Sequence, residues 1–251
     1  MMLRVTALSV RFRHHDGGYS QPLTGLDLTL SRGEVVGLVG GSGAGKSLVA
    51  EALMGLLPRN AEVSGQITLA GLPLAPGQLA LAPQGIDALD PLTRLGAQIS
   101  RFARLAGQPP PDVCAALARL GLPEEAARAF PHQLSGGMAK RALIATALAT
   151  GAPFLIADEP TLGLDPETAD RIMELLAGLA AEGHGVCVIS HDLPRLVAIA
   201  ERVTILQEGR MVETAPAEAF TAHRLTHPFS RALWEAQTWA AQTWSEEAAP
   251  C

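Results

Sequence analysis

Val35-Val36-Gly37-Leu38-Val39 leads directly into Gly40-Gly41-Ser42-Gly43-Ala44-Gly45-Lys46-Ser47, and this stretch decides the fold. Residues 40–47 contain a glycine, four residues and then Gly-Lys-Ser, which is the spacing of a loop that surrounds phosphate with backbone N–H groups. Residues 35–39 are a short apolar run typical of a buried strand, and apolar residues recur at helical spacing after Lys46 as far as Pro58. A glycine loop between a strand and a helix predicts an anion site at the helix N-terminus.

Each part of this phosphate loop, residues 40–47, has an expected role. The glycines let the backbone turn inward around phosphates, Lys46 supplies a positive charge, and the Ser47 hydroxyl is an expected ligand of Mg²⁺. The predicted phosphate-binding residues are Gly40, Gly41, Ser42, Gly43, Ala44, Gly45, Lys46 and Ser47. The alternative is a glycine-rich turn with a chance lysine, but it leaves the flanking strand and helix unexplained.

The composition bounds the remaining interpretation. At 251 residues the chain is long enough for one α/β domain with an inserted subdomain. Its formal net charge of −6 gives no general electrostatic reason to bind nucleic acid, and we expect no nucleic-acid partner. The mean hydropathy of +0.21 comes from Ala and Leu spread along the chain, without a run of about eighteen uncharged apolar residues. We therefore expect a soluble protein, or one peripheral to a membrane.

Neither the cysteines nor the N-terminal residues predict a further function. Cys114, Cys187 and Cys251 are far apart and odd in number, so we expect neither a disulfide framework nor a metal cluster. Residues 1–10 lack the basic segment and the apolar core of a signal peptide. Both features are typical of a cytosolic protein.

Three further apolar runs are each followed by polar residues. Leu79-Ala80-Leu81-Ala82 leads to Gln84, Phe154-Leu155-Ile156-Ala157 leads to Asp158-Glu159, and Val186-Cys187-Val188-Ile189 leads to Ser190-His191-Asp192. In a twisted parallel sheet, ligands bind outside the carboxyl ends of the strands. The three polar segments and the phosphate loop are therefore predicted to converge on one crevice.

The polar residues of this crevice suit phosphoryl transfer to water. We expect Asp158 to hold Mg²⁺ and Glu159 to orient or deprotonate the attacking water, although adjacent acids can also cap a helix or form a solvated pair. His191 could reach the terminal phosphate from the next strand, or could simply precede the helix that starts near Asp192. Gln84 is a candidate because it follows a strand, whereas a glutamine in a loop usually meets solvent.

A second phosphate-facing glycine loop lies at Leu134-Ser135-Gly136-Gly137-Met138. Two such loops in one small protein imply a shared site. Farther along the chain, Asp165-Pro166-Glu167 has the sequence of a helix N-cap, an N1 proline and a first-turn acid. Asp165 is predicted to serve as this cap and as an interface contact.

Taken in order, these motifs resemble those of the ATP-binding subunits of ABC transporters. The resemblance rests on residues 40–47, Gln84, 134–138, Leu155-Ile156-Ala157-Asp158-Glu159-Pro160, Gly163-Leu164-Asp165 and Ser190-His191-Asp192, and it covers nearly the whole chain. It implies a phosphate-loop NTPase core with a mainly parallel sheet, an N-terminal antiparallel β layer and an inserted α-helical subdomain. It also implies ATP and Mg²⁺ as cofactors, with Mg²⁺ near Ser47, Gln84 and Asp158 and with Glu159, His191 and Gln84 in catalysis.

The resemblance further implies a division of the chain. Residues 1–85 and 151–222 would form the nucleotide-binding core, residues 86–150 the helical subdomain, and residues 223–251 a C-terminal tail. Within the subdomain, residues 98–106 and 113–120 are predicted to be amphipathic helices, the second capped by Asp112. Phe12 has the position of the aromatic residue that usually stacks on adenine, and Tyr19 is the alternative.

The working unit implied by the resemblance is a dimer. Two protomers, identical or merely related, would enclose two ATP molecules, so that Ser135, Gly136 and Gly137 present donors to the γ-phosphate bound by the opposite subunit. ATP binding would close the pair, and hydrolysis would reopen it. The other implied partners are transmembrane permease subunits and, indirectly, a substrate-binding protein. The chain would then be peripheral, on the cytoplasmic face of the inner membrane.

Two short segments resemble the peptide and nickel importers of this family. Asp87-Ala88-Leu89-Asp90-Pro91-Leu92 is similar to the loop after their glutamine, and His227-Pro228-Phe229-Ser230-Arg231-Ala232-Leu233 is similar to their His-Pro motif. The expected activity is ATP hydrolysis that drives uptake of nickel, a metal chelate or a small peptide. The tail contains Gln237-Thr238-Trp239, a repeat at Gln242-Thr243-Trp244 and Cys251, and lacks the usual cysteine-containing extension of the peptide importers. This favours nickel or a metal chelate.

Some features depart from the family pattern, and one other function has to be weighed. The segment from Gly65 to Gln84 is short, and Lys140 replaces the usual glutamine of the helix after the second loop, which we expect to leave the core motif unaffected. The alternative function is a soluble ABC-class ATPase without a permease, acting in DNA repair or translation. Such a protein would need a long coiled-coil insertion or a second ATPase domain, and the sequence shows neither.

Overall fold

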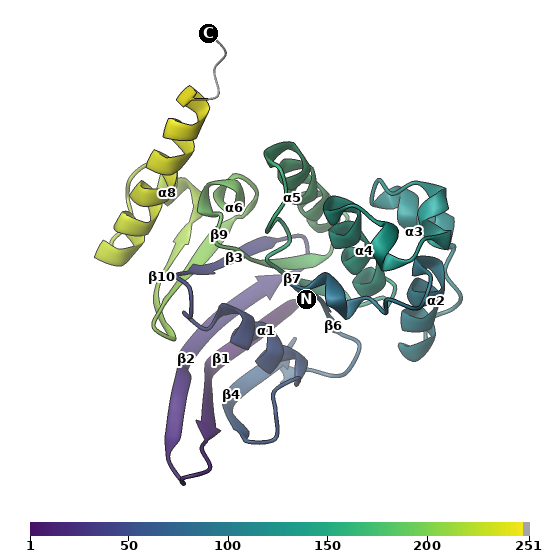
Figure 1. Cartoon of the computed structure of the whole chain (residues 1–251). Helices are drawn as coiled ribbons and strands as arrows, with labels where there is room; N and C mark the ends of the chain where they lie inside the picture. Colours follow the sequence, from purple (N-terminus) through teal and green to yellow (C-terminus); the bar gives the residue numbers. More distant parts are fainter. Residues whose placement is uncertain (248–251) are drawn as a thin grey trace.

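A curved ten-stranded sheet runs through the protein (Figure 1). The structure is a computed structural model that describes residues 1–247, with side chains described as far as Thr238. The strands lie in the order β5-β4-β1-β2-β10-β9-β3-β8-β7-β6. Their bounds are β1 (Met2–Arg13), β2 (Tyr19–Ser31), β3 (Val35–Gly40), β4 (Ala61–Leu69), β5 (Leu72–Pro73), β6 (Leu79–Ala82), β7 (Phe154–Asp158), β8 (Gly185–Ile189), β9 (Arg202–Gln207) and β10 (Arg210–Pro216).

The part of the sheet that precedes the predicted polar segments is parallel. The pairs β9/β3, β3/β8, β8/β7 and β7/β6 are all parallel, and every residue of β3, β7 and β8 is buried. Strands covered on both faces form continuous apolar runs, which explains the absence of alternation in their sequences. The four apolar runs predicted to be strands are β3, β6, β7 and β8, so this prediction is confirmed.

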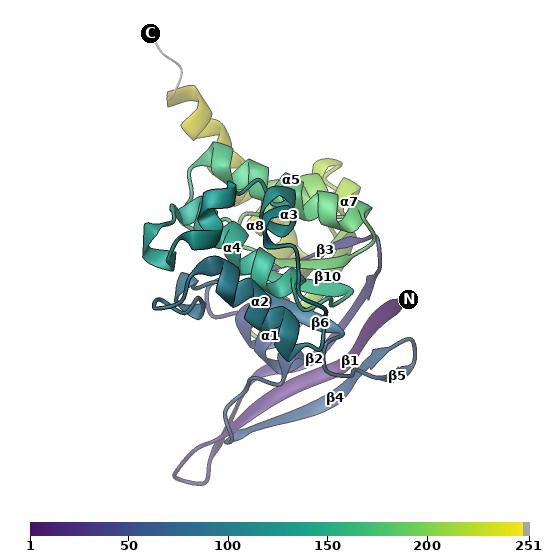
Figure 2. The same cartoon turned by 90° about the vertical axis from the view of Figure 1, so that its right-hand side faces the viewer.

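The N-terminal strands form the expected antiparallel layer, which projects from the parallel part (Figure 2). β1 pairs with β2 on one side and with β4 on the other, and β5 adds a short edge to β4. β2 connects this layer to the rest of the sheet through a parallel pairing with β10. The register between β1 and β4 shifts between Thr6 and Ser9, where Ala7 has a φ of 50°. The fold class predicted from the sequence is confirmed.

Helices cover both faces of the sheet. Alternate residues of β3 belong to two apolar cores: Leu38 packs with α1 and the antiparallel layer, and Val39 packs with α4, α5 and α6. The helices are α1 (Lys46–Met54), α2 (Leu95–Leu105), α3 (Val113–Arg119), α4 (Gly136–Leu148), α5 (Pro166–Ala181), α6 (Leu193–Ile199), α7 (Ala217–Thr221) and α8 (Pro228–Glu247). Among these helices of residues 1–247, none is both long and apolar enough to cross a membrane.

The chain between β6 and β7 is helical. It contains α2, α3, α4 and the short 3₁₀ turns Ile86–Ala88, Glu124–Arg128 and Pro131–Gln133. The helix predicted over residues 98–106 begins earlier, at the fully buried Leu95. The helix predicted over residues 113–120 ends at Arg119, because Gly121 turns the chain with a φ of 64°. The Asp112 carboxylate caps α3 by accepting a bond from Ala115 N at 3.0 Å, as predicted. The boundaries proposed for the four parts of the chain stay predictions.

The C-terminal elements pack on the core through α7 and α8. Trp234 of α8 is buried against Phe220 of α7, with ring centroids 5.6 Å apart. The side chains of Trp239 and Trp244, and Cys251 as a whole, lie outside the described residues. Of the other cysteines, Cys114 is exposed and Cys187 is buried in β8, and neither forms a disulfide. Burial raises the pKa of the Cys187 thiol to about 12.

Candidate functional site

The phosphate loop connects β3 to α1 through a backbone that only glycine adopts easily. Gly43 and Gly45 have φ values of 74° and 94°, in the left-handed region that strains other residues. Gly40 needs its missing side chain for another reason, because a Cβ atom there would lie 2.5 Å from the carbonyl oxygen of Leu206. The motif therefore contains glycines for conformation at two positions and for close packing at a third.

Lys46 is the first residue of α1 and folds back over the loop. Its Nζ donates hydrogen bonds to the carbonyl oxygens of Gly40 and Gly41, at 3.0 and 3.2 Å. No side chain caps the start of α1. The first N–H groups of a helix are then available to an anion, and the Lys46 ammonium adds a full positive charge beside them.

The ends of four adjacent strands bring the predicted residues together. The phosphate loop follows β3, His191 follows β8, Asp158 ends β7 with Glu159 directly after it, and Gln84 follows β6. A pocket of about 740 Å³ lies over these strand ends. It is lined by Phe12, Pro22, Ser42, Gly43, Ala44, Gly45, Lys46, Ser47, Leu48, Gln84, Glu159, Leu162 and His191. The structure thus places residues from six separate segments of the chain around one cavity.

Asp158 is a buried acid with one oxygen unused. Its side chain is 6% exposed, and its Oδ1 has no hydrogen-bond partner among the described residues. Burial raises the pKa of this carboxyl, while the neighbouring Ser47 hydroxyl and the Lys46 ammonium act in the opposite direction. A buried carboxylate oxygen without a partner, next to a serine hydroxyl, is the donor set that Mg²⁺ accepts.

Glu159 is held from three directions. Its carboxylate Oε2 lies 2.7 Å from Nδ1 of His191 and also accepts a bond from His191 N at 3.3 Å. Its peptide N–H donates to Ile189 O at 2.8 Å, and its carbonyl oxygen accepts a bond from Lys140 Nζ at 2.8 Å. These contacts hold a φ of 47°, which is unusual for a glutamate. The carboxylate is therefore fixed at the edge of the phosphate pocket.

Lys140 contacts the segments of Gln84 and Glu159 and not the second glycine loop, and the sequence predicted no role for it in the site. Its side chain is buried, and Nζ donates to Gln84 O at 2.7 Å as well as to Glu159 O. Burial lowers the pKa of this ammonium, and the carboxylates of Glu159 and Asp158 oppose that effect. The signal in the sequence is a single charged residue on the otherwise uncharged buried face of α4, two residues after the second glycine loop.

The second glycine loop and Asp165 lie outside the phosphate pocket. Ser135 caps α4, with its hydroxyl accepting a bond from Met138 N at 3.3 Å, and Asp165 caps α5 in the same way with Thr168 N at 2.9 Å. This backbone hydrogen bond from Thr168 is the main reason that the pKa of Asp165 is lowered. A Cβ atom on Gly137 would collide with the side chain of Thr168, so glycine permits the close approach of α4 and α5.

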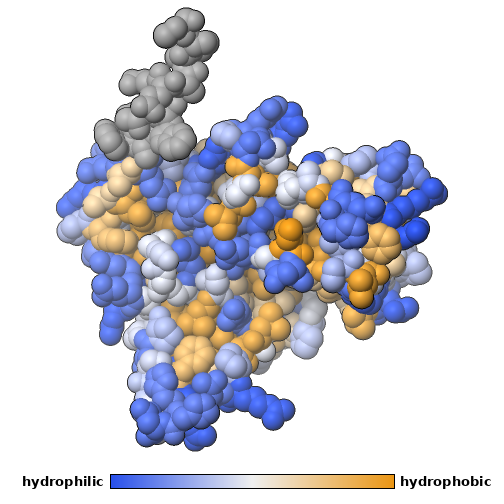
Figure 3. Space-filling model, in the orientation of Figure 1, coloured by the Kyte–Doolittle hydropathy of each residue, from blue (hydrophilic) through white to orange (hydrophobic). Residues whose placement is uncertain are grey.

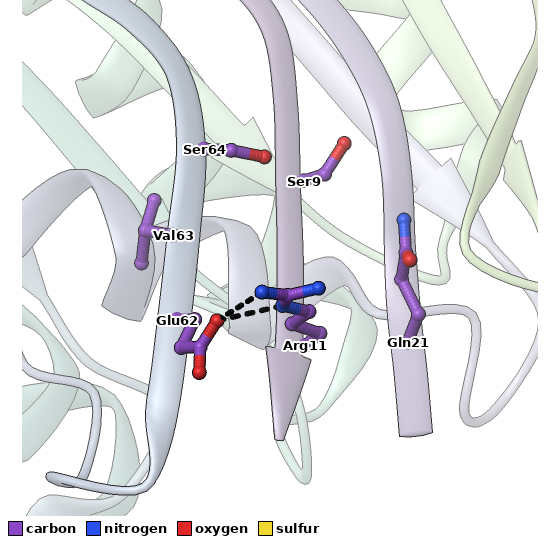
Figure 4. Close-up of a pocket in the computed structure, with 6 residues that line it drawn as sticks. All are labelled: Ser9, Arg11, Gln21, Glu62, Val63 and Ser64. Atoms are coloured by element: carbon purple, nitrogen blue, oxygen red, sulfur yellow. Dashed lines mark hydrogen bonds and ion pairs between the residues drawn. The ribbon is translucent and has the colours of Figure 1, made fainter. Parts of the chain in front are cut away.

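The two aromatic candidates for adenine differ in position. Phe12 lines the phosphate pocket, whereas the preceding residue, Arg11, lines a shallow hollow on β1, β2 and β4 (Figure 4). In that hollow Arg11 forms an ion pair with Glu62 at 2.5 Å, and its guanidinium lies 4.8 Å from the ring centroid of Tyr19. Successive residues of a strand point to opposite faces, so Tyr19 is engaged with Arg11 while Phe12 faces the phosphate loop.

Comparison with known proteins decides the family. A sequence model described as ABC transporter matches residues 23–162, which is more than half of the chain. This chain belongs to the ABC transporter family.

Its fold agrees with solved members of the family. A dimeric ATP-binding cassette in a post-hydrolysis state with ADP and Pi superposes with a TM-score of 0.73 at 26% identity, covering 86% of this chain and 98% of that one. The cbiO1 protein of Clostridium perfringens, part of an ABC transporter complex, superposes with a TM-score of 0.73 at 28% identity, covering 88% of this chain and 91% of that one.

Relatives of this ABC protein are named for peptide transport. The oligopeptide transport ATP-binding protein OppD of Mycobacterium tuberculosis (strain ATCC 25618 / H37Rv) is 36% identical over 235 residues, 85% of this chain and 38% of that relative. The corresponding protein of Lactococcus lactis subsp. cremoris (strain SK11) is 33% identical over 255 residues, which cover 92% of this chain and 74% of that relative. A putative peptide import ATP-binding protein of Brucella abortus (strain 2308) is 37% identical over 229 residues, which cover 84% of this chain and 67% of that relative.

These relatives confirm one part of the sequence analysis and correct another. The resemblance to the ATP-binding subunits of the peptide-importer branch is confirmed. The preference for nickel or a metal chelate is corrected, because the names of the relatives favour peptide over metal. The chain spans well under half of the length of the mycobacterial relative.

Proposed function

We propose that this ABC protein is the ATP-hydrolysing subunit of a membrane importer whose cargo is a small peptide. The observation that carries the proposal is Glu159, a buried carboxylate fixed by His191 at the edge of the pocket that contains Lys46. An acid in this position, one residue after a second acid on the same strand, is what hydrolysis of a phosphoanhydride requires. The relatives named for peptide import support the choice of cargo.

The residues around the pocket divide the work of holding ATP. The phosphate loop and the Lys46 ammonium bind the phosphates, and the face of Phe12 stacks on the adenine ring. Ser47, Asp158 and Gln84 would hold Mg²⁺, which neutralises charge on the phosphoryl group during transfer. Among the described residues, no group of three or more His, Cys, Asp or Glu side chains could bind a metal ion by itself. This fits an ion that is shared with the nucleotide phosphates.

The catalytic step is assigned to Glu159 and His191. The Glu159 carboxylate orients the attacking water and accepts its proton, and the contact of its Oε2 with Nδ1 of His191 sets its direction. His191 is more exposed than Glu159, with 56% of its side chain accessible against 9%. We infer that the exposed part of the imidazole approaches the γ-phosphate once ATP is bound.

The second glycine loop is assigned to an ATP molecule on a partner subunit. Ser135 does not line the pocket that contains Lys46, and Gly136 lines a different hollow together with Gly163 and Leu164. The N-terminus of α4 provides backbone donors suited to phosphate. A head-to-tail pair, of identical or related chains, would place Ser135, Gly136 and Gly137 on the partner's γ-phosphate and Asp165 at the interface.

An apolar groove offers a docking place for a permease. It has a volume of about 660 Å³, and its larger apolar lining residues come from α1, β6, α2 and α4 with their adjoining loops: Met54, Leu56, Leu79, Leu81, Phe102, Leu105 and Leu143. Leu56 and Leu105 are 61% and 75% exposed, which is unusual for leucine unless a partner covers it. Figure 3 shows apolar residues exposed between the antiparallel strands and the helical elements. We infer that a short helix of a transmembrane subunit occupies this groove, which would place the chain on the cytoplasmic face of the inner membrane.

Uptake measurements test the cargo. The importer is purified from its own cell, its permease, second ATPase and substrate-binding protein are identified, and uptake of a dipeptide, Ni²⁺ and chelated Ni²⁺ is compared between wild type and Lys46→Ala. The Lys46→Ala cells should lose dipeptide uptake, because the variant lacks the ammonium that binds phosphate, and should retain metal uptake. Loss of metal uptake with normal dipeptide uptake would contradict the peptide assignment. Retention of all uptake would contradict the role in ATP-driven import.

A further inference from the structure

Lys140 connects two segments of the site through their main chains. Its Nζ donates to the carbonyl oxygen of Gln84, which follows β6, and to the carbonyl oxygen of Glu159, which follows β7. These strands are neighbours in the sheet. The lysine itself comes from α4, the helix that begins with the second glycine loop. One side chain therefore spans three segments that each carry a predicted site residue.

A buried ammonium needs compensation. Only 7% of Lys140 is exposed, and transfer of an unpaired charge from water to such a place is strongly unfavourable. Two short hydrogen bonds to carbonyl oxygens and the nearby carboxylates of Glu159 and Asp158 provide the compensation. Methionine of similar volume would avoid the problem of burial but would leave both carbonyl oxygens without this donor. Stabilisation of the buried Lys140 ammonium therefore depends on the orientation of the Gln84 and Glu159 carbonyl groups.

The Glu159 carbonyl is part of a strained peptide geometry. With φ at 47°, the Glu159 backbone occupies a left-handed conformation that is unfavourable for a residue other than glycine. The bond from Lys140 fixes the carbonyl side of this residue, and the bond to Ile189 O fixes its N–H side. The direction of the carboxylate depends on both, because the side chain leaves the backbone between them.

We propose that Lys140 is a positioning residue that fixes the Glu159 backbone against the Gln84 turn and so aims the catalytic carboxylate. This inference rests on the proposed function, since it gives Glu159 the catalytic step. A misplacement of a reacting group by about 1 Å lowers a rate by around a hundredfold. Lys140 does not line the phosphate pocket, so its loss should leave nucleotide affinity nearly unchanged.

The test uses the importer complex, purified with its partner ATPase and carrying Lys140→Met or Lys140→Gln. Binding of trinitrophenyl-ATP gives the nucleotide Kd, and phosphate release gives kcat and KM. We expect Lys140→Met to lower kcat at least tenfold with Kd changed by less than threefold. Lys140→Gln keeps an amide donor that can reach one of the two carbonyl groups, so it should recover part of kcat. A merely structural lysine would not produce this separation of kcat from Kd or the partial rescue.

Arg119→Met is the matched control. Arg119 also connects the helical part to the core, through Glu182, but does so near the start of β8, at the end of the sheet opposite the phosphate loop. It should keep kcat within twofold of wild type. Wild-type kcat in Lys140→Met, or an equal loss in Arg119→Met, would overturn the positioning role while leaving the proposed ATPase intact. Absence of ATP turnover in the wild-type complex, purified with its partner ATPase and able to bind nucleotide, would overturn the proposed function and this inference with it.

Discussion

At the scale of single residues, the site holds Glu159 in a strained backbone conformation and fixes it there by hydrogen bonds. Glu159 has a positive φ, and its N–H, carbonyl and carboxylate are each engaged, by Ile189, Lys140 and His191 respectively. Unfavourable backbone conformations persist where surrounding contacts over-determine them, and they cluster at functional sites. A flexible acid would have to be ordered during each turnover, whereas this carboxylate is ordered before ATP arrives.

Glu159→Gln should separate binding from hydrolysis. The amide keeps the size of the side chain and can still contact His191, but it cannot accept a proton from water. We expect kcat for ATP to fall by a factor on the order of 10²–10⁴ with the nucleotide Kd nearly unchanged, and a closed ATP-bound dimer to accumulate. Single-turnover phosphate release and gel filtration with ATP provide the measurements.

The control for this substitution is Glu167→Gln. Glu167 is an acid on the first turn of α5 with a 76% exposed side chain that pairs with Arg171 at 2.6 Å. It should turn over ATP like wild type. A Glu159→Gln protein with wild-type turnover would show that another residue activates the water.

The sequence was sufficient to predict where Asp158 and Glu159 lie but insufficient to predict the contacts of Lys140. The acids follow an apolar run, and that position places them at the edge of a parallel sheet whatever the rest of the fold does. The contacts of Lys140 join α4 to residues 56 and 19 positions away along the chain, so they exist only after the helix has packed on β6 and β7. The lone charge on the buried face of α4 marks the position of Lys140, but no local pattern identifies the partners of such a tertiary contact.

At the scale of elements, the strands that could be predicted are those buried on both faces, because their sequences are continuous apolar runs. β3, β6, β7 and β8 were predicted from apolar runs. The lengths and registers of the antiparallel strands were not, since β1 pairs with both β2 and β4 through shifts that depend on turns such as Ala7 and Gly65. A carbonyl oxygen of Ala7 would lie 2.6 Å from a Cβ atom on Gly65, a contact between strands that no local sequence pattern predicts.

The start of α8 depends on one acid of β10. The Glu213 carboxylate accepts bonds from Thr226 N at 2.8 Å, from the Thr226 hydroxyl at 2.7 Å and from His227 N at 3.1 Å. Burial raises the pKa of Glu213, but the Ser230 hydroxyl and the donors of Thr226 and His227 outweigh this effect and lower the pKa to about 2. The His-Pro segment singled out in the sequence is therefore held by a strand residue.

Glu213 should make stability depend on acidity. The pKa of this carboxyl is about 2 in the folded protein, whereas a glutamate in an unfolded chain has an ordinary pKa of 4.5. Its contribution to stability is therefore complete above pH 4.5 and is lost as pH falls toward 2. Glu213→Gln should lower the free energy of unfolding by about 1–3 kcal/mol at pH 7, and the difference from wild type should shrink below pH 4.5. Urea unfolding at pH 7, 5, 4 and 3 measures this difference.

Glu218→Gln is the control for that prediction. Glu218 is 76% exposed and lies 3.4 Å from Arg224, so its removal should change stability by less than about 0.5 kcal/mol at every pH. A Glu213→Gln protein whose deficit stays constant from pH 7 to pH 3 would show that the lost contact is not that of a charged carboxylate.

At the scale of the whole molecule, the two glycine loops do not share a pocket. Lys46 and Glu159 line one cavity, while Ser135 caps α4 outside it. The family resemblance predicted this separation by placing the second loop on the ATP of another subunit. The geometry of one chain is compatible with that arrangement, and the dimeric cassettes among the solved relatives support it. In the two-chain arrangement proposed above, the pocket of one chain would be half of an ATP site.

Ser135→Arg should block closure of the dimer and leave each ATP pocket intact. The larger cation replaces a small capping residue at the surface that would meet the partner's γ-phosphate, so in the Glu159→Gln background we expect the ATP-dependent dimer to be lost in gel filtration. Trinitrophenyl-ATP should bind with unchanged Kd, because Ser135 does not line the pocket. Ser100→Arg, an exposed position on α2, introduces the same charge elsewhere and should dimerise normally. An ATP-dependent dimer of Ser135→Arg would show that the second loop does not face the partner, and the two-chain ATP site would have to be abandoned.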